Sequence, residues 1–264
     1  FLFLIGKLSH FLILSSISAL IISKYFTSRL DLQRVKQSIR ESFTIGKSTI
    51  TLGIMMMATS FSASLVELII KVFITRYGGL EEVGLYQAGW AINTQYLGLV
   101  FTAMATDYFP RLTQQFQSKN QRIVNNTINQ QSEIALLILA PLICGMVVFL
   151  PIVLSILYTS EFLLVVTMTR LFLIGSLIKA GSWAVSFLFL AAGDGKVYLL
   201  NEVGIKLFNL PLYLACYYFG GLLWVGYGFV LNYSVYFIWV TFVANKKYAF
   251  VHSRLFSKIL VINI

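Results

Sequence analysis

The stretch EIALLILAPLICGMVVFLPIVLSIL (133–157) carries one charged residue, Glu133, at its first position. A helix needs about 20 predominantly apolar residues to cross the hydrocarbon core of a bilayer, and soluble core helices rarely need such runs. Similar runs recur along the chain, in which 58% of the residues are hydrophobic and 11% are charged. Soluble domains contain about 25% charged residues. The sequence therefore predicts an all-α protein, a polytopic transmembrane helix bundle.

Working outward from this stretch gives seven apolar runs that are long enough to be candidate spans. The run 163–192 is longer than a bilayer requires, so we expect it to tilt or kink. The first run begins at Phe1 and has no signal-peptide cleavage site after it, so we expect an internal span of a chain truncated at its N-terminus. The seven ranges are 1–22, 48–74, 84–107, 133–157, 163–192, 197–219 and 222–244.

The connections between these runs divide Lys and Arg unequally, because fourteen lie on one side and only Arg76 lies on the other. Cytoplasmic loops carry such an excess, so residues 24–47, 109–132 and 245–264 are predicted to be cytoplasmic. Anionic headgroups suffice as partners for the net charge of +10, and no nucleic acid is required. The fourteen residues are Lys24, Arg29, Arg34, Lys36, Arg40, Lys47, Arg111, Lys119, Arg122, Lys196, Lys246, Lys247, Arg254 and Lys258.

The polar segment 24–47 is the long connection early in the chain, and its apolar residues recur as on one face of a helix. We interpret it as a cytoplasmic surface helix that joins two bundles, and we place the domain boundary there. Residues 48–244 then form a six-helix transmembrane bundle. The tail 245–264 is too short and too basic to span, so it is either a cytoplasmic or interfacial segment or the start of a further helix.

Several ionisable residues fall inside the apolar runs. Each costs roughly 2.5–3.5 kcal/mol at bilayer depth on insertion scales, so such residues usually face a cavity or a partner. Lys179 has no carboxylate three or four residues away, which makes it the strongest candidate for a cation in a substrate-binding cavity. Arg170 is a second candidate, although it lies near the outer end of its run, from which an arginine can snorkel.

Two acid–base pairs have the spacing of neighbours on one helix face. Glu67 precedes Lys71 by four residues, and Glu202 precedes Lys206 by four. Each pair is a candidate for substrate binding or for a self-neutralised ion pair without a role in transport. Glu202 is also the favoured acid from another helix to pair with Lys179.

Uncharged polar residues gather in YQAGWAINTQYLG (86–98), which contains Gln87, Asn93, Thr94 and Gln95. These side chains cannot all face lipid without a large cost, so some line a wet cavity or bond to neighbouring helices. Both readings stay open at this point, and Gln87, Asn93 and Gln95 are kept as candidate substrate contacts.

No motif for catalysis, a cofactor or a metal emerges. AAGDGK (191–196) lacks the spacing of a phosphate-binding loop and a preceding strand, so it predicts a tight turn between helices. Cys144 and Cys216 lie in apolar runs without metal-ligand spacing, and the two histidines form no metalloenzyme motif. We therefore predict a protein that is not an enzyme and needs no cofactor.

Three stretches carry a resemblance to a known family. VGLYQAGWAINTQYLGLVFTAMATDYFPRLT (83–113), LYTSEF (157–162) and LIKAGSW (177–183), followed by LLNEVG (199–204), resemble Wzx-type O-antigen flippases in order and spacing. These polysaccharide biosynthesis proteins belong to the multidrug/oligosaccharidyl-lipid/polysaccharide exporter (MOP) superfamily. The resemblance covers residues 43–244 and matches the second of two pseudo-symmetric bundles. It implies that residues 1–23 hold the last helix of the first bundle.

The resemblance implies a function. Flippases of this type move an undecaprenyl-pyrophosphate-linked oligosaccharide, such as an O-antigen unit for lipopolysaccharide, across the bacterial inner membrane. A cation in a water-filled cavity lowers the barrier for the diphosphate, and the bundles rock to alternate access. We expect a monomer in contact with membrane lipid, with a proton or a sodium ion as the coupling ion.

Three other functions are possible for a polytopic membrane protein. A cation-coupled multidrug or small-molecule exporter of the same superfamily would favour carboxylates in its cavity, whereas Lys179 favours an anionic substrate. A membrane-embedded polysaccharide polymerase would need a large outer loop, and the longest outer loop predicted here is 75–83. A non-transporting scaffold would have a dry interior without charges.

Overall fold

The computed structural model describes residues 32–118, 120–158 and 160–263, so the predicted first span, 1–22, lies outside the described residues. Within these ranges the elements are helices joined by short connections, and no strand occurs. The described structure therefore agrees with the all-α class that the apolar runs predict.

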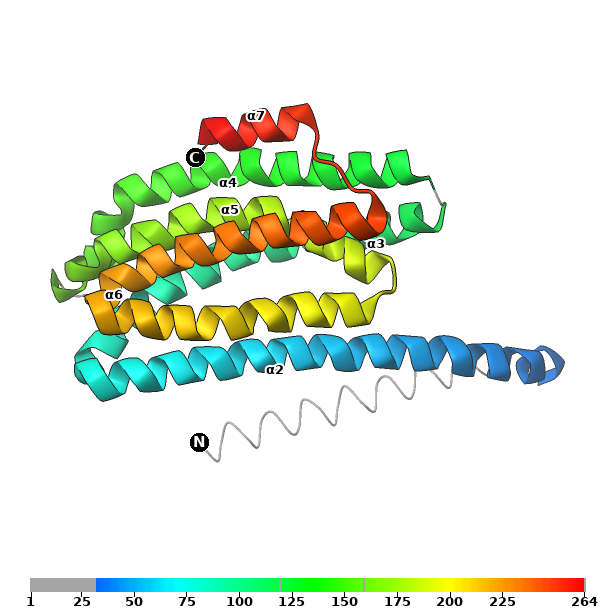
Figure 1. Cartoon of the computed structure of the whole chain (residues 1–264), viewed down its shortest axis with the longest axis horizontal. Helices are drawn as coiled ribbons and strands as arrows, with labels where there is room; N and C mark the ends of the chain where they lie inside the picture. The colour runs from blue at the N-terminus through cyan, green and yellow to red at the C-terminus, as the bar shows by residue number, and fades with distance from the viewer. Residues whose placement is uncertain (1–31, 119, 159, 264) are drawn as a thin grey trace. The chain divides into compact units, whose positions relative to one another are not determined.

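The two longest helices each contain a reversal at glycine. Helix α2 (Leu32–Ala91) is interrupted at Gly79, where φ is 78°, and α6 (Gly195–Tyr248) is interrupted at Gly220 and Gly221, where φ of Gly221 is 64°. L-residues with a side chain rarely adopt positive φ, so glycine is the residue that permits these turns. Each of the two helices therefore consists of two segments that run back along one another (Figure 1).

The other elements follow one another with short turns. The turn between α5 and α6 falls on Ala192–Asp194, as the AAGDGK stretch predicts. The run 163–192 begins in a 3₁₀ turn, so its α-helix is shorter than the run itself. The elements are η1 (Ile92–Tyr96), a π-helix; α3 (Leu97–Gln117); α4 (Gln121–Leu157); η2 (Ser160–Val165), a 3₁₀-helix; α5 (Val166–Ala191); and α7 (Arg254–Asn263).

Among the described residues, four helical stretches are long and apolar enough to cross a membrane: Ile50–Gln117, Gln121–Leu157, Glu161–Ala191 and Gly195–Tyr248. The last stretch has 54 residues. That corresponds to about 80 Å of helix against a hydrocarbon core of about 30 Å. The first and last stretches therefore supply two segments each, on either side of their glycine reversals. Six of the predicted runs fall on helical segments, while the count of seven spans stays a prediction.

The described part of the predicted linker, from Leu32, is helical and continues without a break into the following apolar run. The chain separates into two compact units at Gly53 and Ile54, so the division lies just after the predicted boundary at residue 47. The bundle that carries the site belongs to the second unit, residues 54–264. The assignment of 24–47 as a cytoplasmic linker stays a prediction.

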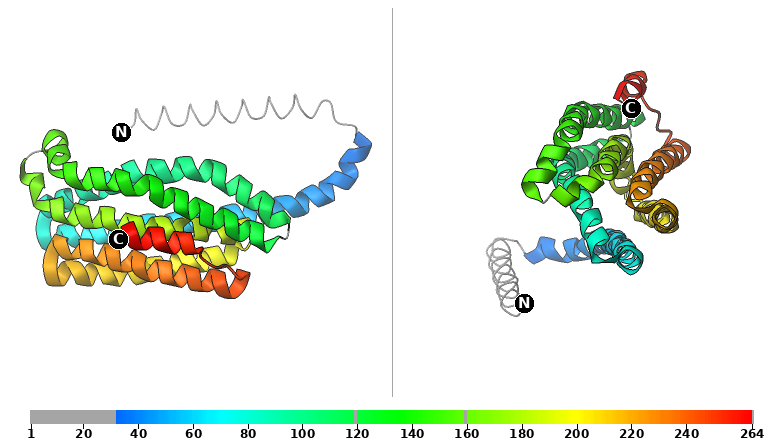
Figure 2. Two further views of the ribbon diagram at one scale, coloured as in Figure 1. Left: turned by 90° about the horizontal axis from the view of Figure 1, so that it is seen from above. Right: turned by 90° about the vertical axis from the view of Figure 1, so that its left-hand side faces the viewer.

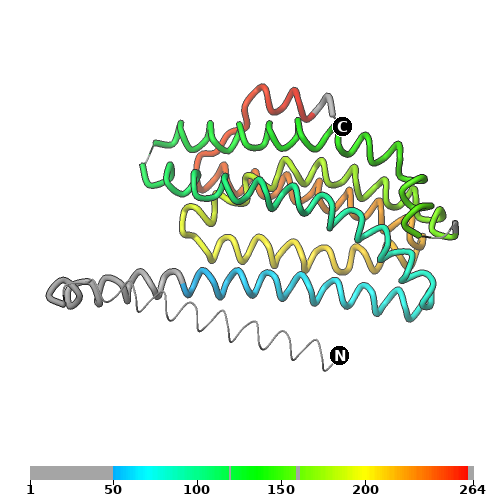
Figure 3. Tube along the Cα trace, turned by 180° about the vertical axis from the view of Figure 1, so that it is seen from behind, coloured from blue at the N-terminus to red at the C-terminus, as the bar shows by residue number. Residues whose placement is uncertain are grey.

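Helix α5 is the central helix of this second unit. It packs against α4 on one side and α6 on the other (Figure 2), and Figure 3 shows the same packing from behind. In its most apolar window 50% of the residues are buried, against 28% or less in the other three stretches. Residues of α5 therefore reach the interior of the bundle, which is where Lys179 lies.

The C-terminal segment is fastened to α4 by a ladder of polar side chains at four-residue spacing. Gln121 and Asn125 donate to the carbonyls of Tyr248 and Ala249, and Asn129 donates to Val251 O at 2.9 Å. Glu133 accepts from the hydroxyl of Ser253. Phe256 of α7 is buried in the same apolar cluster as residues of α3, α4 and α5. The tail therefore packs along the bundle, and its placement relative to the membrane stays a prediction.

Candidate functional site

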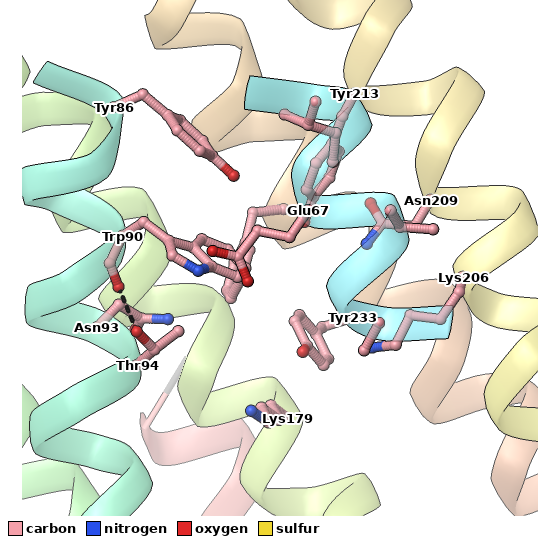
Figure 4. A pocket seen from close by; sticks show the side chains of 14 residues that line it. Glu67, Tyr86, Trp90, Asn93, Thr94, Lys179, Lys206, Asn209, Tyr213 and Tyr233 are labelled. Atoms are coloured by element: carbon pink, nitrogen blue, oxygen red, sulfur yellow. Dashed lines mark hydrogen bonds between the residues drawn. The ribbon is translucent and has the colours of Figure 1, made fainter. Parts of the chain in front are cut away.

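Four elements, α2, η1, α5 and α6, surround a cavity of about 160 Å³ inside the second unit (Figure 4). Its wall contains two lysines, one glutamate and several hydroxyl and amide groups, although it is built from the predicted membrane spans. Polar groups at this depth are expensive unless they face water, a ligand or each other. The lining residues are Ala63, Val66, Glu67, Ile70, Tyr86, Trp90, Asn93, Thr94, Lys179, Lys206, Asn209, Tyr213, Phe229 and Tyr233.

The π-helix η1 places two polar residues at this cavity. A π-turn contains one more residue than an α-turn, and such turns are frequent at functional sites. Asn93 is buried, and its Oδ1 accepts a hydrogen bond of 2.8 Å from Ser176 Oγ of α5. Thr94 satisfies its own hydroxyl by donating to Trp90 O at 2.8 Å. The amide of Asn93 is thereby fixed against α5 at the edge of the cavity.

Lys179 reaches the cavity from α5 without a carboxylate at ion-pair distance, although the charge of Glu202, the acid favoured from the sequence, acts on it from farther away. Its Nζ lies 5.2 Å from the ring centroid of Phe101 and 5.5 Å from that of Tyr233. No carboxylate oxygen of the described residues lies within 4.0 Å of Lys179 Nζ. The ion pairs among these residues are Glu67–Lys71 and Asp194–Lys247. Aromatic rings attract a cation without neutralising its charge. The ammonium group is therefore stabilised inside the bundle while it remains available to an anion.

The other charges at the cavity are Lys206 and Glu67. Glu67 forms an ion pair of 2.6 Å with Lys71, as their spacing predicts. The equally spaced Glu202 and Lys206 form no ion pair among the described residues, because Glu202 instead accepts a hydrogen bond from the hydroxyl of Tyr236. With Glu67 paired to Lys71, the unpaired charge that faces the cavity is positive.

Three buried oxygens at the cavity lack a hydrogen bond of ordinary geometry among the described residues, although Asn209 and the Tyr213 hydroxyl lie near enough to interact with each other. They are the hydroxyls of Tyr86 and Tyr213 and Oδ1 of Asn209. Tyr86 and Tyr213 are 0% and 1% exposed. Buried polar groups are nearly always paired, so each exception calls for an explanation, and a bound ligand or water supplies one.

Four of the nine candidate residues from the sequence line the cavity: Lys179, Lys206, Glu67 and Asn93. The structure places the other five elsewhere. Lys71 is bound in the ion pair with Glu67 and does not line the cavity. Gln87 in α2 and Gln95 in η1 are exposed, because successive residues of a helix point in different directions. The remaining two, Arg170 and Glu202, make their contacts with the protein itself.

Arg170 does not reach the cavity. Its Nε donates a hydrogen bond of 3.1 Å to the backbone carbonyl of Val147 in α4. From the sequence, Arg170 was expected either to face a cavity or to snorkel from the outer end of its run. The structure shows a third arrangement, in which Arg170 forms a hydrogen bond between α5 and α4.

The sequence alone did not single out Tyr86, Trp90, Asn209, Tyr213 or Tyr233 as site residues. Tyr86 and Trp90 belong to the 86–98 polar stretch, where only the amides were selected. Asn209 lies in an otherwise apolar run, and its amide is the signal that could have marked the α6 wall. The tyrosines and the tryptophan resemble ordinary core residues until the helices are packed.

Several long apolar helices packed around a polar cavity indicate a multi-pass membrane protein. Solved structures of transporters share this fold. The chain is similar to an outward-facing multidrug resistance MATE family transporter of the MOP superfamily, with a TM-score of 0.66 and 16% identity over 81% of this chain and 50% of that one. It is also similar to the crystal structure of a MATE point mutant (TM-score 0.65, 17% identity, 72% and 43% coverage).

The chain is also similar to a MOP superfamily transporter from Pyrococcus furiosus, with a TM-score of 0.64 and 16% identity over 82% of this chain and 50% of that one. The binding pocket of that transporter is described as having reverse polarity, which suggests a different function. This chain thus spans about half the length of the transporters it resembles. No curated protein matches it. The family model for polysaccharide biosynthesis proteins matches residues 6–167, and the chain belongs to that family.

Proposed function

We propose that this chain is the substrate-binding bundle of a flippase that moves a lipid-linked oligosaccharide, carried on undecaprenyl pyrophosphate, across the bacterial inner membrane. The family membership and the transporter fold support a polysaccharide-related membrane transporter. The observation that carries the substrate class is Lys179, which lines a cavity between the predicted spans with no carboxylate of the described residues within ion-pair distance.

The chemistry of the cavity suits a diphosphate. Lys179 and Lys206 both line it, and the one carboxylate there is already paired with Lys71. A phosphate oxygen accepts charge-assisted hydrogen bonds from an ammonium group, and these are stronger where water is scarce. The lysines therefore compensate the charge of the head group at the depth where it is most costly. No bond of the substrate is broken in this process.

Alternating access requires a second bundle, against which this one rocks. A proton or sodium gradient is the proposed source of energy, and the monomer is the proposed unit. A cation-coupled drug exporter is the competing function, and Glu67 in the cavity is the feature that favours it. The pairing of Glu67 with Lys71 weakens that feature.

Proteoliposomes test the proposal. A fluorescent polyprenyl-diphosphate oligosaccharide is placed in one leaflet, and its appearance in the other is followed for this chain alone and for the chain joined to an N-terminal bundle. We expect translocation only with both bundles, and its loss in Lys179→Ala. Export of a cationic dye by the joined protein, without movement of the lipid-linked sugar, would establish the drug exporter instead.

A further inference from the structure

An apolar groove of about 250 Å³ lies on α6 and is lined by residues from both segments of this helix, before and after the reversal at Gly220. We infer that this groove is a binding site for an anionic phospholipid, with an acyl chain in the groove and the head group at the basic end of α6. The inference is independent of the proposed function, because no residue of the groove lines the polar cavity. The groove is formed by Leu200, Gly204, Ile205, Phe208, Val235 and Trp239.

The groove faces away from the polar cavity. Gly204 lies two residues before Lys206, and Val235 lies two residues after Tyr233. Lys206 and Tyr233 line the cavity. Two residues correspond to about 200° around a helix, so the two linings lie on nearly opposite sides of each segment. Leu200 in the groove is 72% exposed, so the groove is open at the surface of the second unit.

Trp239 and Gly204 give the groove a fixed wall and free space. The indole Nε1 of Trp239 donates a hydrogen bond of 2.7 Å to Asn201 Oδ1, and the amide of Asn201 in turn donates to Val197 O at 2.8 Å. The polar atom of the indole is therefore satisfied within the protein, and the ring presents apolar surface to the groove. No atom lies within 4 Å of the position of a Cβ at Gly204. A flexible chain of methylene groups can occupy such a space.

Two lysines continue the rows of residues that line the groove. Lys196 precedes Leu200 by four residues, or about 6 Å along the helix, and Lys246 follows Trp239 by seven residues, or about 10 Å. Spacings of four and seven residues keep side chains on one face of a helix. Both lysines are exposed, and neither forms an ion pair among the described residues. They therefore place positive charge beyond one end of the groove.

The acidic residues in this part of α6 and its preceding turn are already engaged. Asp194 pairs with Lys247 and accepts a hydrogen bond of 3.0 Å from the hydroxyl of Tyr248, while Glu202 accepts from the hydroxyl of Tyr236. The charge left unpaired is positive, at the end of α6 that is predicted to be cytoplasmic. Basic pockets between membrane helices on this side bind anionic head groups. The charge thus favours an anionic lipid over a zwitterionic one, whose head group carries its own cation.

A helix from another chain is the competing occupant, and the size of the groove argues against it. One turn of a helix, about 10 Å wide and 5.4 Å long, fills roughly 400 Å³. The groove holds about 250 Å³, which is too little for a single turn. An acyl chain is much narrower than a helix, so it suits this space better.

Native mass spectrometry of the 264-residue chain, with phosphatidylglycerol or phosphatidylcholine of the same acyl chains, tests the head-group end. We expect tighter binding of phosphatidylglycerol to the wild type. Lys196→Gln and Lys246→Gln should each weaken it by about fivefold, the effect of one lysine near an anionic lipid surface, and leave phosphatidylcholine unchanged. Lys258→Gln is the matched control, because Lys258 is exposed and lies on α7, away from the groove.

Gly204→Leu tests the groove itself. Its side chain would enter the free space and displace the acyl chain, so both lipids should bind about tenfold more weakly, the effect of about two methylene groups that lose contact. Gly145→Leu on α4 is the matched control, since nothing lies within 4 Å of a Cβ there and Gly145 lies outside the groove.

Three results would overturn the lipid site. The first is equal binding of the two lipids by the wild type, and the second is binding of phosphatidylglycerol by both lysine variants as tight as by Lys258→Gln. The third is unchanged lipid binding in Gly204→Leu, and loss of a dimer in that variant would then assign the groove to a second copy of the chain. Because these residues lie outside the polar cavity, failure of the lipid site leaves the proposed function untouched.

Discussion

Arg170 Nε lies 3.1 Å from the backbone carbonyl oxygen of Val147, on the neighbouring helix α4. That carbonyl would normally accept from the N–H of residue 151, which is Pro151 and has no N–H. The arginine therefore satisfies an acceptor that the proline has left free. The charged Arg170 within an apolar run is thus explained by a backbone carbonyl that lacks its usual partner, because the residue four positions later is a proline.

Replacement of Arg170 by Met should destabilise the protein by about 1–3 kcal/mol, the cost of an unpaired buried acceptor. In a Pro151→Ala background the restored N–H binds Val147 O, so the same replacement should cost much less. Thermal unfolding in detergent of the four proteins of this cycle measures the coupling. Equal losses in both backgrounds would show that Arg170 acts through some other contact.

Gly175 is required for packing between α5 and α6. A Cβ at this position would lie 2.4 Å from Cδ1 of Phe229. Gly175→Ala should therefore lower stability by about 1–3 kcal/mol through overpacking. Gly204→Ala is the matched control, because nothing lies within 4 Å of its Cβ position. A melting temperature of Gly175→Ala equal to that of the control would argue against close packing here.

His252, in the connection after α6, should make stability depend on pH. It stacks on Phe256 at 4.3 Å between centroids, and burial lowers its pKa from 6.5 to about 4. Protonation is thus easier in the unfolded chain, so stability is complete above about pH 6.5 and is lost as the pH falls through about 4.

Melting temperatures measured between pH 7 and pH 4 test this prediction, and His252→Phe should remove the part of the slope that belongs to this ring. If the variant keeps the full slope, His252 is not the titrating group.

The basic residues predict the topology, and two exposed positions near the ends of helical segments can report on it. Ser118, at the end of α3, and Leu80, beside the Gly79 reversal, are both exposed. In a chain without Cys144 and Cys216, we expect Leu80→Cys to react with a membrane-impermeant maleimide from outside the cell. Ser118→Cys should react only after permeabilisation, and reaction of both from outside would reject the predicted orientation.

Much of the fold follows from local sequence. The apolar runs located six helical segments, because hydrophobic length alone specifies a helix that suits a bilayer. Other parts of the structure also depend on residues close together in the sequence. These are the AAGDGK turn, the Glu67–Lys71 ion pair and the reversals at paired glycines. The continuous helix through residues 32–53 was not foreseen, since a polar surface helix and the start of a longer helix have the same local pattern.

The site was less predictable, because its residues come from four elements distant in sequence. Lys179 was identified because an ionisable residue inside an apolar run usually faces a cavity or a partner, and this rule can be applied without knowing how the helices pack. Arg170 obeyed the same rule and was misplaced, because its partner is a backbone carbonyl on another helix. Tyr86, Asn209 and Tyr213 become notable only once burial shows that their oxygens lack hydrogen bonds of ordinary geometry.

The central claim is that Lys179 binds the anionic head group, and binding of a sugar-free polyprenyl diphosphate to the chain in nanodiscs tests it most directly. Loss of a hydrogen bond to a charged group should weaken binding by roughly tenfold or more in Lys179→Ala. Lys179→Arg should retain part of the affinity, and Lys258→Ala, an exposed lysine outside the cavity, should retain all of it. Wild-type affinity in Lys179→Ala, or recovery of affinity in the double variant with Glu202→Ala, would contradict a role for Lys179 as a ligand of the diphosphate.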